Sequence, residues 1–232
     1  MPLGDSITDG EFGHGVPPMD ERVGYRRKLY NDLAAMGFNV NFVGSLQGGQ
    51  SANPPLVAPD HEGHSGYTAS QIAQNVRFWL TLNPAGIVLL HVGTNNIDFD
   101  NVANTLADIN RILDEIDRWE SKNNTPVTVF LATIIDRTTL DGLTCDGCNA
   151  NVARVNVKIR ALPARRPNDD IVIVNQHDAL DYSCEDGACD LSPQQSHSGG
   201  IVYIHPTQNG YDKMADTWLP PLLESDKLAT CE

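Results

Sequence analysis

The stretch MPLGDSITDG, residues 1–10, carries the residues on which the predicted fold depends. A short apolar run ends at Gly4, and Asp5 and Ser6 follow it directly in a turn-forming sequence. This pattern predicts a buried strand that breaks at its carboxyl end into a turn holding a serine. Open α/β sheets bind their ligands at the carboxyl ends of their strands. Ser6 is therefore a candidate nucleophile, provided that the chain also supplies a base and an oxyanion site.

Strand and helix patterns alternate through the rest of the chain. Strands are predicted at residues 39–44, 86–92, 127–135 and 171–174, and helices at residues 22–36, 68–82, 102–116, 149–162 and 207–223. Together with the strand before Ser6, this order predicts a five-stranded parallel sheet in a single α/β domain, residues 1–232. Residues 45–60, 136–150 and 176–206 are predicted to be loops.

The composition argues against several classes of function. The chain of 232 residues has a formal net charge of −14, which opposes the phosphates of nucleic acids, so no nucleic-acid partner is expected. No stretch approaches the roughly 18 consecutive apolar residues of a membrane span, so no membrane partner is expected either. These features favour a soluble protein, expected to be a monomer, that acts on neutral substrates.

The cysteines bear on the cellular compartment. Local disulfides Cys145–Cys148 and Cys184–Cys189 are preferred over a zinc site, because the second pair has four intervening residues and no tight histidine spacing accompanies it. Disulfides imply an oxidising compartment, so the protein is predicted to be secreted after removal of a leader, with a cytosolic protein as the alternative. Asn123 begins a glycosylation sequon.

Three further segments place polar groups at the ends of predicted strands or the starts of helices. They are HEGHSGYT at residues 61–68, HVGTNN at residues 91–96 and HPT at residues 205–207. Together they supply a backbone N–H at a glycine, a side-chain amide and an imidazole, which are the parts of an oxyanion hole and a general base. His61 and His64 have the spacing of two zinc ligands, but no third ligand supports zinc, and local hydrogen bonds are preferred.

These segments resemble the four blocks of the SGNH (GDSL-type) hydrolases. The matches are Gly4-Asp5-Ser6, Ser65-Gly66, Gly93-Thr94-Asn95 and His205-Pro206, in the family's order and over nearly the whole chain. The phrases MPLGDSIT and HEGHSGYT are similar to the carbohydrate esterase family 3 branch, which includes acetyl xylan esterases. The resemblance implies a three-layer α/β/α flavodoxin-like fold and the hydrolysis of small acyl esters on polysaccharides, with no metal or cofactor.

Carried onto this sequence, the resemblance assigns four catalytic residues. Ser6 attacks the ester carbonyl, and His205 takes the serine proton and returns it to the leaving sugar hydroxyl. The backbone N–H groups of Ser6 and Gly66 and the side chain of Asn95 hold the oxyanion. The reaction implied passes through an acyl-serine that water then hydrolyses. Asp5 is expected to brace the turn by accepting backbone hydrogen bonds.

One position departs from the family pattern. The family usually has an aspartate three residues before the catalytic histidine, and here that position is Val202. Either Asp190, Asp186 or Asp181 folds back to orient His205, or a backbone carbonyl such as that of Val202 accepts the imidazole N–H. The carbonyl-supported Ser–His dyad is the hypothesis adopted here, although losing a triad aspartate costs about 10⁴ in rate in a serine protease.

Three functions are weighed. The leading prediction is a secreted serine esterase that removes O-acetyl groups from plant polysaccharides such as xylan. A lipase or thioesterase with the same mechanism is the first alternative, and a content of only 6% aromatic residues argues mildly against it. A carbohydrate-binding protein of the same fold, inactive through the missing aspartate, is the second. The intact set of Ser6, Gly66, Asn95 and His205 argues against that one.

Overall fold

Among the residues that the structure describes, five short strands with largely buried side chains form the parallel part of the central sheet. In this computed structural model they are β1 (Pro2–Gly4), β3 (Asp60–Gly63), β4 (Ile87–His91), β5 (Thr128–Ala132) and β7 (Ile171–Val174). A sixth strand, β2 (Leu46–Gln47), pairs antiparallel with β3, and the strand order is β2-β3-β1-β4-β5-β7. The description covers all residues except 14–15, 98–101, 140–145, 184–188, 196–200 and 229–232.

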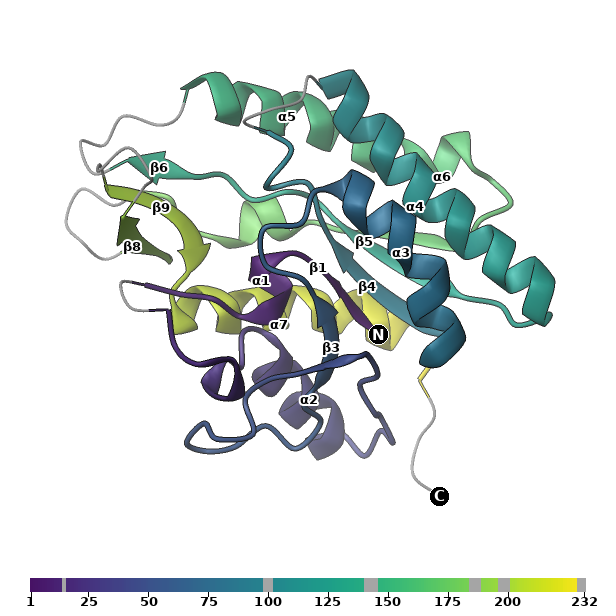
Figure 1. The fold of residues 1–232 in the computed structure, drawn as a ribbon, viewed down its shortest axis with the longest axis horizontal. Coiled ribbons are helices and arrows are strands. Elements are labelled where there is room, and N and C mark those ends of the chain that lie inside the picture. Colours follow the sequence, from purple (N-terminus) through teal and green to yellow (C-terminus); the bar gives the residue numbers. More distant parts are fainter. Residues whose placement is uncertain (14–15, 98–101, 140–145, 184–188, 196–200, 229–232) are drawn as a thin grey trace.

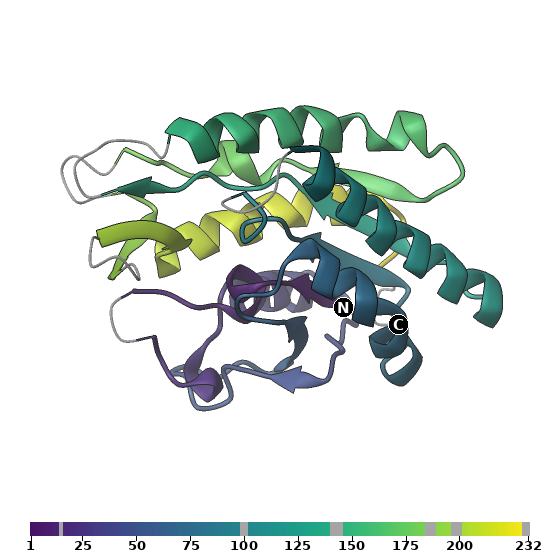
Figure 2. The same ribbon diagram turned by 45° about the horizontal axis from the view of Figure 1, so that its top comes forward.

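Helices cover both faces of this sheet, which confirms the predicted three-layer fold (Figures 1 and 2). One face carries α3 (Ala69–Leu82), α4 (Val102–Asn123), α5 (Asp146–Arg160) and α6 (Leu162–Arg165), and the other carries α2 (Arg26–Ala35) and α7 (Gln208–Glu224). Leu90 and Leu131 pack in the core with α3, α4 and α5, whereas Leu89 and Phe130 pack with α2 and α7. Neighbouring residues of a strand point to opposite faces, so both faces of β4 and β5 need apolar side chains.

The structure corrects one predicted strand and adds another. Residues 39–44 are not a strand, and the place beside β1 belongs to β3, which the sequence pattern did not mark. The chain passes so close to β3 at Gly44 that a Cβ there would lie 2.2 Å from the His61 backbone. Phe42 is buried in the core with α2 and α7. The apolar residues of this segment therefore pack into the core without joining the sheet, which has six strands in the described chain and not five.

A second, antiparallel sheet forms in segments that were predicted to be loops. Its described strands are β6 (Thr138–Thr139), β9 (Ile201–Pro206) and β8 (Leu191–Gln195), in the order β6-β9-β8. The loop predictions at residues 136–150 and 176–206 are therefore wrong in these parts. The end of β9 contacts the short helix α1 (Ser6–Asp9), and this contact joins the two ends of the chain (Figure 1).

The remaining helical elements follow the sequence closely. The predicted helix at residues 22–36 begins at Arg26, and the one at residues 149–162 begins at Asp146. Short 3-10 turns, η1 (Met19–Glu21) and η2 (Gln176–Ala179), complete the described elements. Within the described ranges, no helix combines the length and the apolar character that crossing a membrane requires.

Candidate active site

Ser6 is the first residue of α1, and only Asp5 separates it from strand β1. Asp5 caps this helix, since its Oδ1 accepts a hydrogen bond from the backbone N–H of Ile7 at 3.0 Å. Burial raises the pKa of the Asp5 carboxyl to about 7. Gly4 allows β1 to approach β4, because a Cβ at this position would lie 2.1 Å from the backbone oxygen of His91. A strand end, a cap and one helical turn thus fix the Ser6 hydroxyl.

His205 reaches Ser6 from the other end of the sequence. Strand β9 carries His205, and its Nε2 lies 2.7 Å from Ser6 Oγ. Burial, and to a lesser extent the cations of Arg137 and Arg22, lowers the pKa of His205 to about 4. The imidazole is therefore neutral at neutral pH, and its Nε2 can accept the hydrogen bond that the Ser6 hydroxyl donates. The structure brings the predicted nucleophile and the predicted base into direct contact.

Gly66 and Asn95 lie on segments that flank the Ser6 turn. Strands β3 and β4 lie on either side of β1, and these two residues follow their carboxyl ends. The Asn95 side-chain amide donates to the backbone oxygen of Tyr67 at 2.9 Å, next to Gly66. Gly66 has a φ of 77°, in the left-handed region that favours glycine. A hydrogen bond therefore joins the two segments that carry the predicted oxyanion donors, on the strands that flank β1.

Hydrogen bonds anchor these flanking segments. Ser65 Oγ lies 2.9 Å from Asp9 Oδ2, and this bond links the Gly66 segment to the end of α1. Asn96 Oδ1 accepts a hydrogen bond from the backbone N–H of Ala69 at 2.8 Å, at the start of α3. The side chain of Asn96 therefore supports the helix that follows Gly66.

The aspartates considered as partners of His205 have other partners or lie outside the description. Asp190 accepts hydrogen bonds from two side chains of α7, at 2.8 and 2.6 Å. Asp181 Oδ1 accepts one from the backbone N–H of Ser183 at 2.9 Å. Asp186 is outside the described residues. The hypothesis that a backbone carbonyl orients the His205 ring stays a prediction.

Two charged residues beside the dyad, Glu11 and Arg22, were missed by sequence reasoning. Glu11 Oε2 lies 3.7 Å from His205 Nε2, the ring nitrogen that also faces Ser6. Arg22 Nη1 is 3.0 Å from Glu11 Oε1 and also bonds to the carboxylate of Asp9. The only sequence signal for this group is that Asp9 and Glu11 lie within five residues of Ser6. Charged residues outside any motif are ordinarily predicted to lie on the surface.

Two further arginines hold the backbone of the segments that form the site. Arg26 is fully buried, and its guanidinium donates to the backbone oxygens of Thr8 and Asp9 at 3.2 and 3.1 Å. Arg137 is also buried and donates to the backbone oxygen of Thr94, the residue before Asn95. Each cation therefore holds one of the segments that present a predicted catalytic residue.

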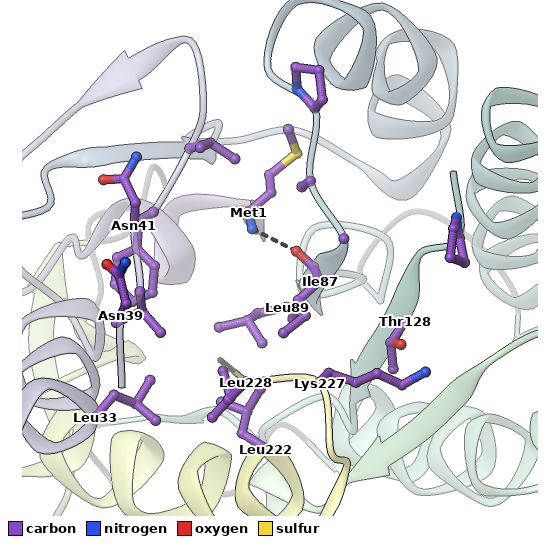
Figure 3. Close-up of a pocket in the computed structure, with 17 residues that line it drawn as sticks. Met1, Leu33, Asn39, Asn41, Ile87, Leu89, Thr128, Leu222, Lys227 and Leu228 are labelled. Carbon is purple, nitrogen blue, oxygen red and sulfur yellow. Dashed lines mark hydrogen bonds between the residues drawn. The ribbon is translucent and has the colours of Figure 1, made fainter. Parts of the chain in front are cut away.

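Two cavities differ in their relation to this site. A cavity of about 340 Å³ lies beside the dyad, between residues 9–11 and residues 63–67. A larger one, of about 460 Å³, is lined by Met1, Ile87 and Thr128 (Figure 3). These three residues lie at the amino ends of their strands, whereas Ser6 follows the carboxyl end of β1. The larger cavity is therefore at the opposite end of the sheet from the dyad.

The predicted disulfides fall largely outside the description. Cys145 and Cys184, one member of each predicted pair, are not among the described residues, so both pairings stay predictions. Cys189 is buried beside the start of β8.

Comparison with known proteins agrees with this arrangement. A family model described as the GDSL-like Lipase/Acylhydrolase family matches residues 3–213. No curated protein sequence matches the chain.

Several solved structures share the fold over nearly the whole chain. An acetyl esterase carrying a serine-to-alanine mutation, with an acetate ion, has a TM-score of 0.70 at 23% identity, covering 98% of this chain and 97% of that one. A carbohydrate esterase family 3 protein from Talaromyces cellulolyticus has a TM-score of 0.68 at 24% identity, with coverage of 98% and 97%. The family 3 carbohydrate esterase of Clostridium thermocellum has a TM-score of 0.67 at 25% identity, with coverage of 97% and 96%.

Proposed function

We propose that the substrate of this protein is an O-acetyl ester on a plant polysaccharide such as xylan. The premise is that the chain belongs to the GDSL-like lipase/acylhydrolase family and is an ester hydrolase. The observation that carries the proposal is the 2.7 Å contact between the Ser6 hydroxyl and a His205 imidazole that is neutral at neutral pH. The similar solved structures, an acetyl esterase and two family 3 carbohydrate esterases, support the choice of ester.

The acylation step uses the dyad and the two flanking segments. Ser6 Oγ attacks the acetyl carbonyl carbon while His205 Nε2 takes the hydroxyl proton. The oxyanion receives hydrogen bonds from the backbone N–H groups of Ser6 and Gly66 and from the side-chain amide of Asn95. Asn95 has two amide hydrogens, so one can hold Tyr67 while the other faces the oxyanion. Collapse breaks the bond to the sugar oxygen, which takes the proton from His205.

The deacylation step repeats the same chemistry with water. His205 Nε2 takes a proton from a water molecule, whose oxygen attacks the acetyl carbonyl carbon on Ser6. The same donors hold the second oxyanion. Collapse returns the proton from His205 to Ser6 Oγ and releases acetic acid, which gives its proton to water and becomes acetate. The serine and the imidazole are thereby restored, and the reaction consumes only the ester and water.

The surroundings of the dyad favour a short acyl group over a long one. The cavity on the Glu11 side of the dyad is lined by the charged residues Asp9, Glu11 and Arg22 as well as by apolar side chains. Placing an alkyl chain against the three charged groups would remove them from water without offering hydrogen bonds, which is unfavourable. The apolar cavity that could hold such a chain lies at the other end of the sheet. This arrangement supports an acetylesterase over a lipase or thioesterase.

The proposal extends to where and how the protein acts. The predicted disulfides and the glycosylation sequon at Asn123, the last residue of α4, support secretion. The net charge of −14 supports a neutral substrate over nucleic acid. We propose a secreted monomer acting on acetylated polysaccharide or on a small acyl ester.

Acetate release from acetylated xylan tests the proposal, with p-nitrophenyl acetate and p-nitrophenyl palmitate assayed in parallel. The wild type is expected to cleave both acetyl esters and to act weakly on the palmitate ester. Ser6→Ala should lower the rate of acetate release at least about 10⁴-fold, because it removes the nucleophile. Ser183→Ala, the same change at an exposed serine, should keep it. Preferential cleavage of the palmitate ester would contradict the acetylesterase and favour a lipase, and full activity in Ser6→Ala would contradict the mechanism.

A further inference from the structure

The cavity of about 340 Å³ lies next to the dyad, on the side where Glu11 approaches His205. Glu11 lines this cavity, and its Oε2 is 3.7 Å from His205 Nε2. During acylation His205 returns a proton to the leaving oxygen through the same nitrogen, so that oxygen must come within hydrogen-bond distance of Nε2. The rest of the alcohol then extends over Glu11 and into the cavity.

The cavity offers more hydrogen-bond acceptors than donors. The single hydroxyl hydrogen of Ser65 faces both Asp9 Oδ2 at 2.9 Å and Glu11 Oε1 at 2.7 Å. Arg22 bonds to both carboxylates, but the two groups together can accept several more hydrogen bonds. Such a lining is complemented by a ligand that carries several hydroxyl donors.

Another part of the lining is aromatic and held in place. The ring of His64 stacks on Tyr67 and on Trp79, with ring centroids 4.9 and 4.2 Å apart. His64 Nε2 also lies 2.8 Å from Glu62 Oε2. His64 and Tyr67 line the cavity together with Leu46. A sugar ring has hydroxyls at its edge and C–H groups on its faces, and this lining offers a matching surface to each.

The charges of the cavity select against an acidic sugar. Asp9 and Glu11 contribute two negative charges, and Arg22 supplies one positive charge between them. The whole chain carries a formal net charge of −14. A carboxylate on the ligand would meet like charge at the site and from the rest of the protein.

We infer that this cavity binds the alcohol part of the ester, that this part is an uncharged sugar ring, and that Glu11 determines the specificity by accepting its hydroxyl hydrogens. The inference rests on the proposed function, because it needs an ester whose alcohol is a sugar. It goes further by assigning the sugar to one cavity and to one carboxylate.

The test compares Glu11→Gln on two acetates that both need a proton for their leaving alkoxide. Acetylated xylo-oligosaccharide carries sugar hydroxyls, whereas ethyl acetate has none, so effects that act through His205 should appear equally in both. Glu11→Gln is expected to lower kcat/KM on the sugar ester by about tenfold more than on ethyl acetate, the effect of weakening one hydrogen bond to a charged acceptor. Glu21→Gln, the same change at an exposed glutamate of η1, should leave both rates unaltered.

Each other outcome has a separate meaning. An equal fall on both substrates would overturn the inference, because Glu11 would then act only through His205. A wild type that cleaves ethyl acetate but no acetylated sugar would overturn the proposed function itself. If Glu11→Gln does not fold, Met19→Trp replaces it: Met19 lines the cavity and is 46% exposed. A filled cavity should lower the rate on the sugar ester more than on ethyl acetate, and an equal effect would again overturn the inference.

Discussion

The two ends of the central sheet each hold a cavity, and the smaller cavity lies beside the reactive residues. The cavity at the amino ends of the strands measures about 460 Å³ and is lined largely by apolar side chains, among them Leu33, Leu222 and Leu228 (Figure 3). The one at the carboxyl ends measures about 340 Å³ and is lined by the charged residues Asp9, Glu11 and Arg22 together with apolar side chains. We call them the amino-end and carboxyl-end cavities. Size alone would direct attention to the wrong end of the molecule.

The charged groups at the two ends are held very differently. At the amino-end cavity, Lys227 pairs with Asp170 at 2.8 Å, but both side chains are nearly half exposed, at 44% and 48%. Such surface pairs contribute little to stability. At the carboxyl end, Arg26 is fully buried and Asp9 is 2% exposed. Charges taken out of water need bonded partners, and proteins maintain such networks where chemistry requires them.

The largest expected difference between the two ends is in kcat, when one asparagine side chain is removed at each end. Asn95→Ala at the carboxyl end should lower kcat on p-nitrophenyl acetate by about 10²–10³, because it removes a proposed oxyanion donor. Asn41→Ala at the exposed rim of the amino-end cavity should leave kcat unaltered. Steady-state kinetics of the two variants decide the matter. Similar losses in both would mean that the amide at Asn95 supports only the fold.

The part of the fold that the sequence predicts is the part held by apolar side chains. Strands β4 and β5 are buried on both faces, and their unbroken apolar runs mark them. Strand β3 could not be found in this way, because its buried side chains are polar. Glu62, for example, is fully buried and accepts a hydrogen bond from the backbone N–H of Ser45 at 2.5 Å. Its burial depends on partners that only the folded chain supplies.

The same limit applies to the site. Ser6 and His205 are 199 residues apart, yet each stands in a recognisable block, and the structure joins them. Glu11 and Arg22 stand in no block, and charged residues without a pattern are assigned to the surface. Their place beside the dyad follows from the bonds among Asp9, Arg22 and Ser65, which bring three segments together. Such a network can be read only from the structure.

Adding a methyl group at one end of the sheet should lower the free energy of unfolding more than adding one at the other end. Gly4→Ala at the carboxyl end places a Cβ 2.1 Å from the backbone oxygen of His91, so the backbone must shift. We expect it to lower the free energy of unfolding by about 1–3 kcal/mol or more. Gly86→Ala at the amino-end cavity meets no atom within 4 Å and should change that free energy by less than about 1 kcal/mol. Urea unfolding measures both, and equal stability of the two variants would contradict the packing described for β1.

The smallest expected effect is a shift in pH dependence caused by removing one cation. Catalysis needs neutral His205, whose pKa is about 4, so kcat/KM should be constant near neutral pH and fall about tenfold per pH unit below that pKa. The cation of Arg137 disfavours the protonated imidazole. In Arg137→Met the pKa of His205 should therefore rise, and the acid limb of the profile should move to higher pH by a fraction of a unit. Lys227→Met removes a cation from the amino-end cavity and should leave the limb in place. If the limb stayed fixed in Arg137→Met, or moved equally in both variants, the charge at the carboxyl end would not act on His205.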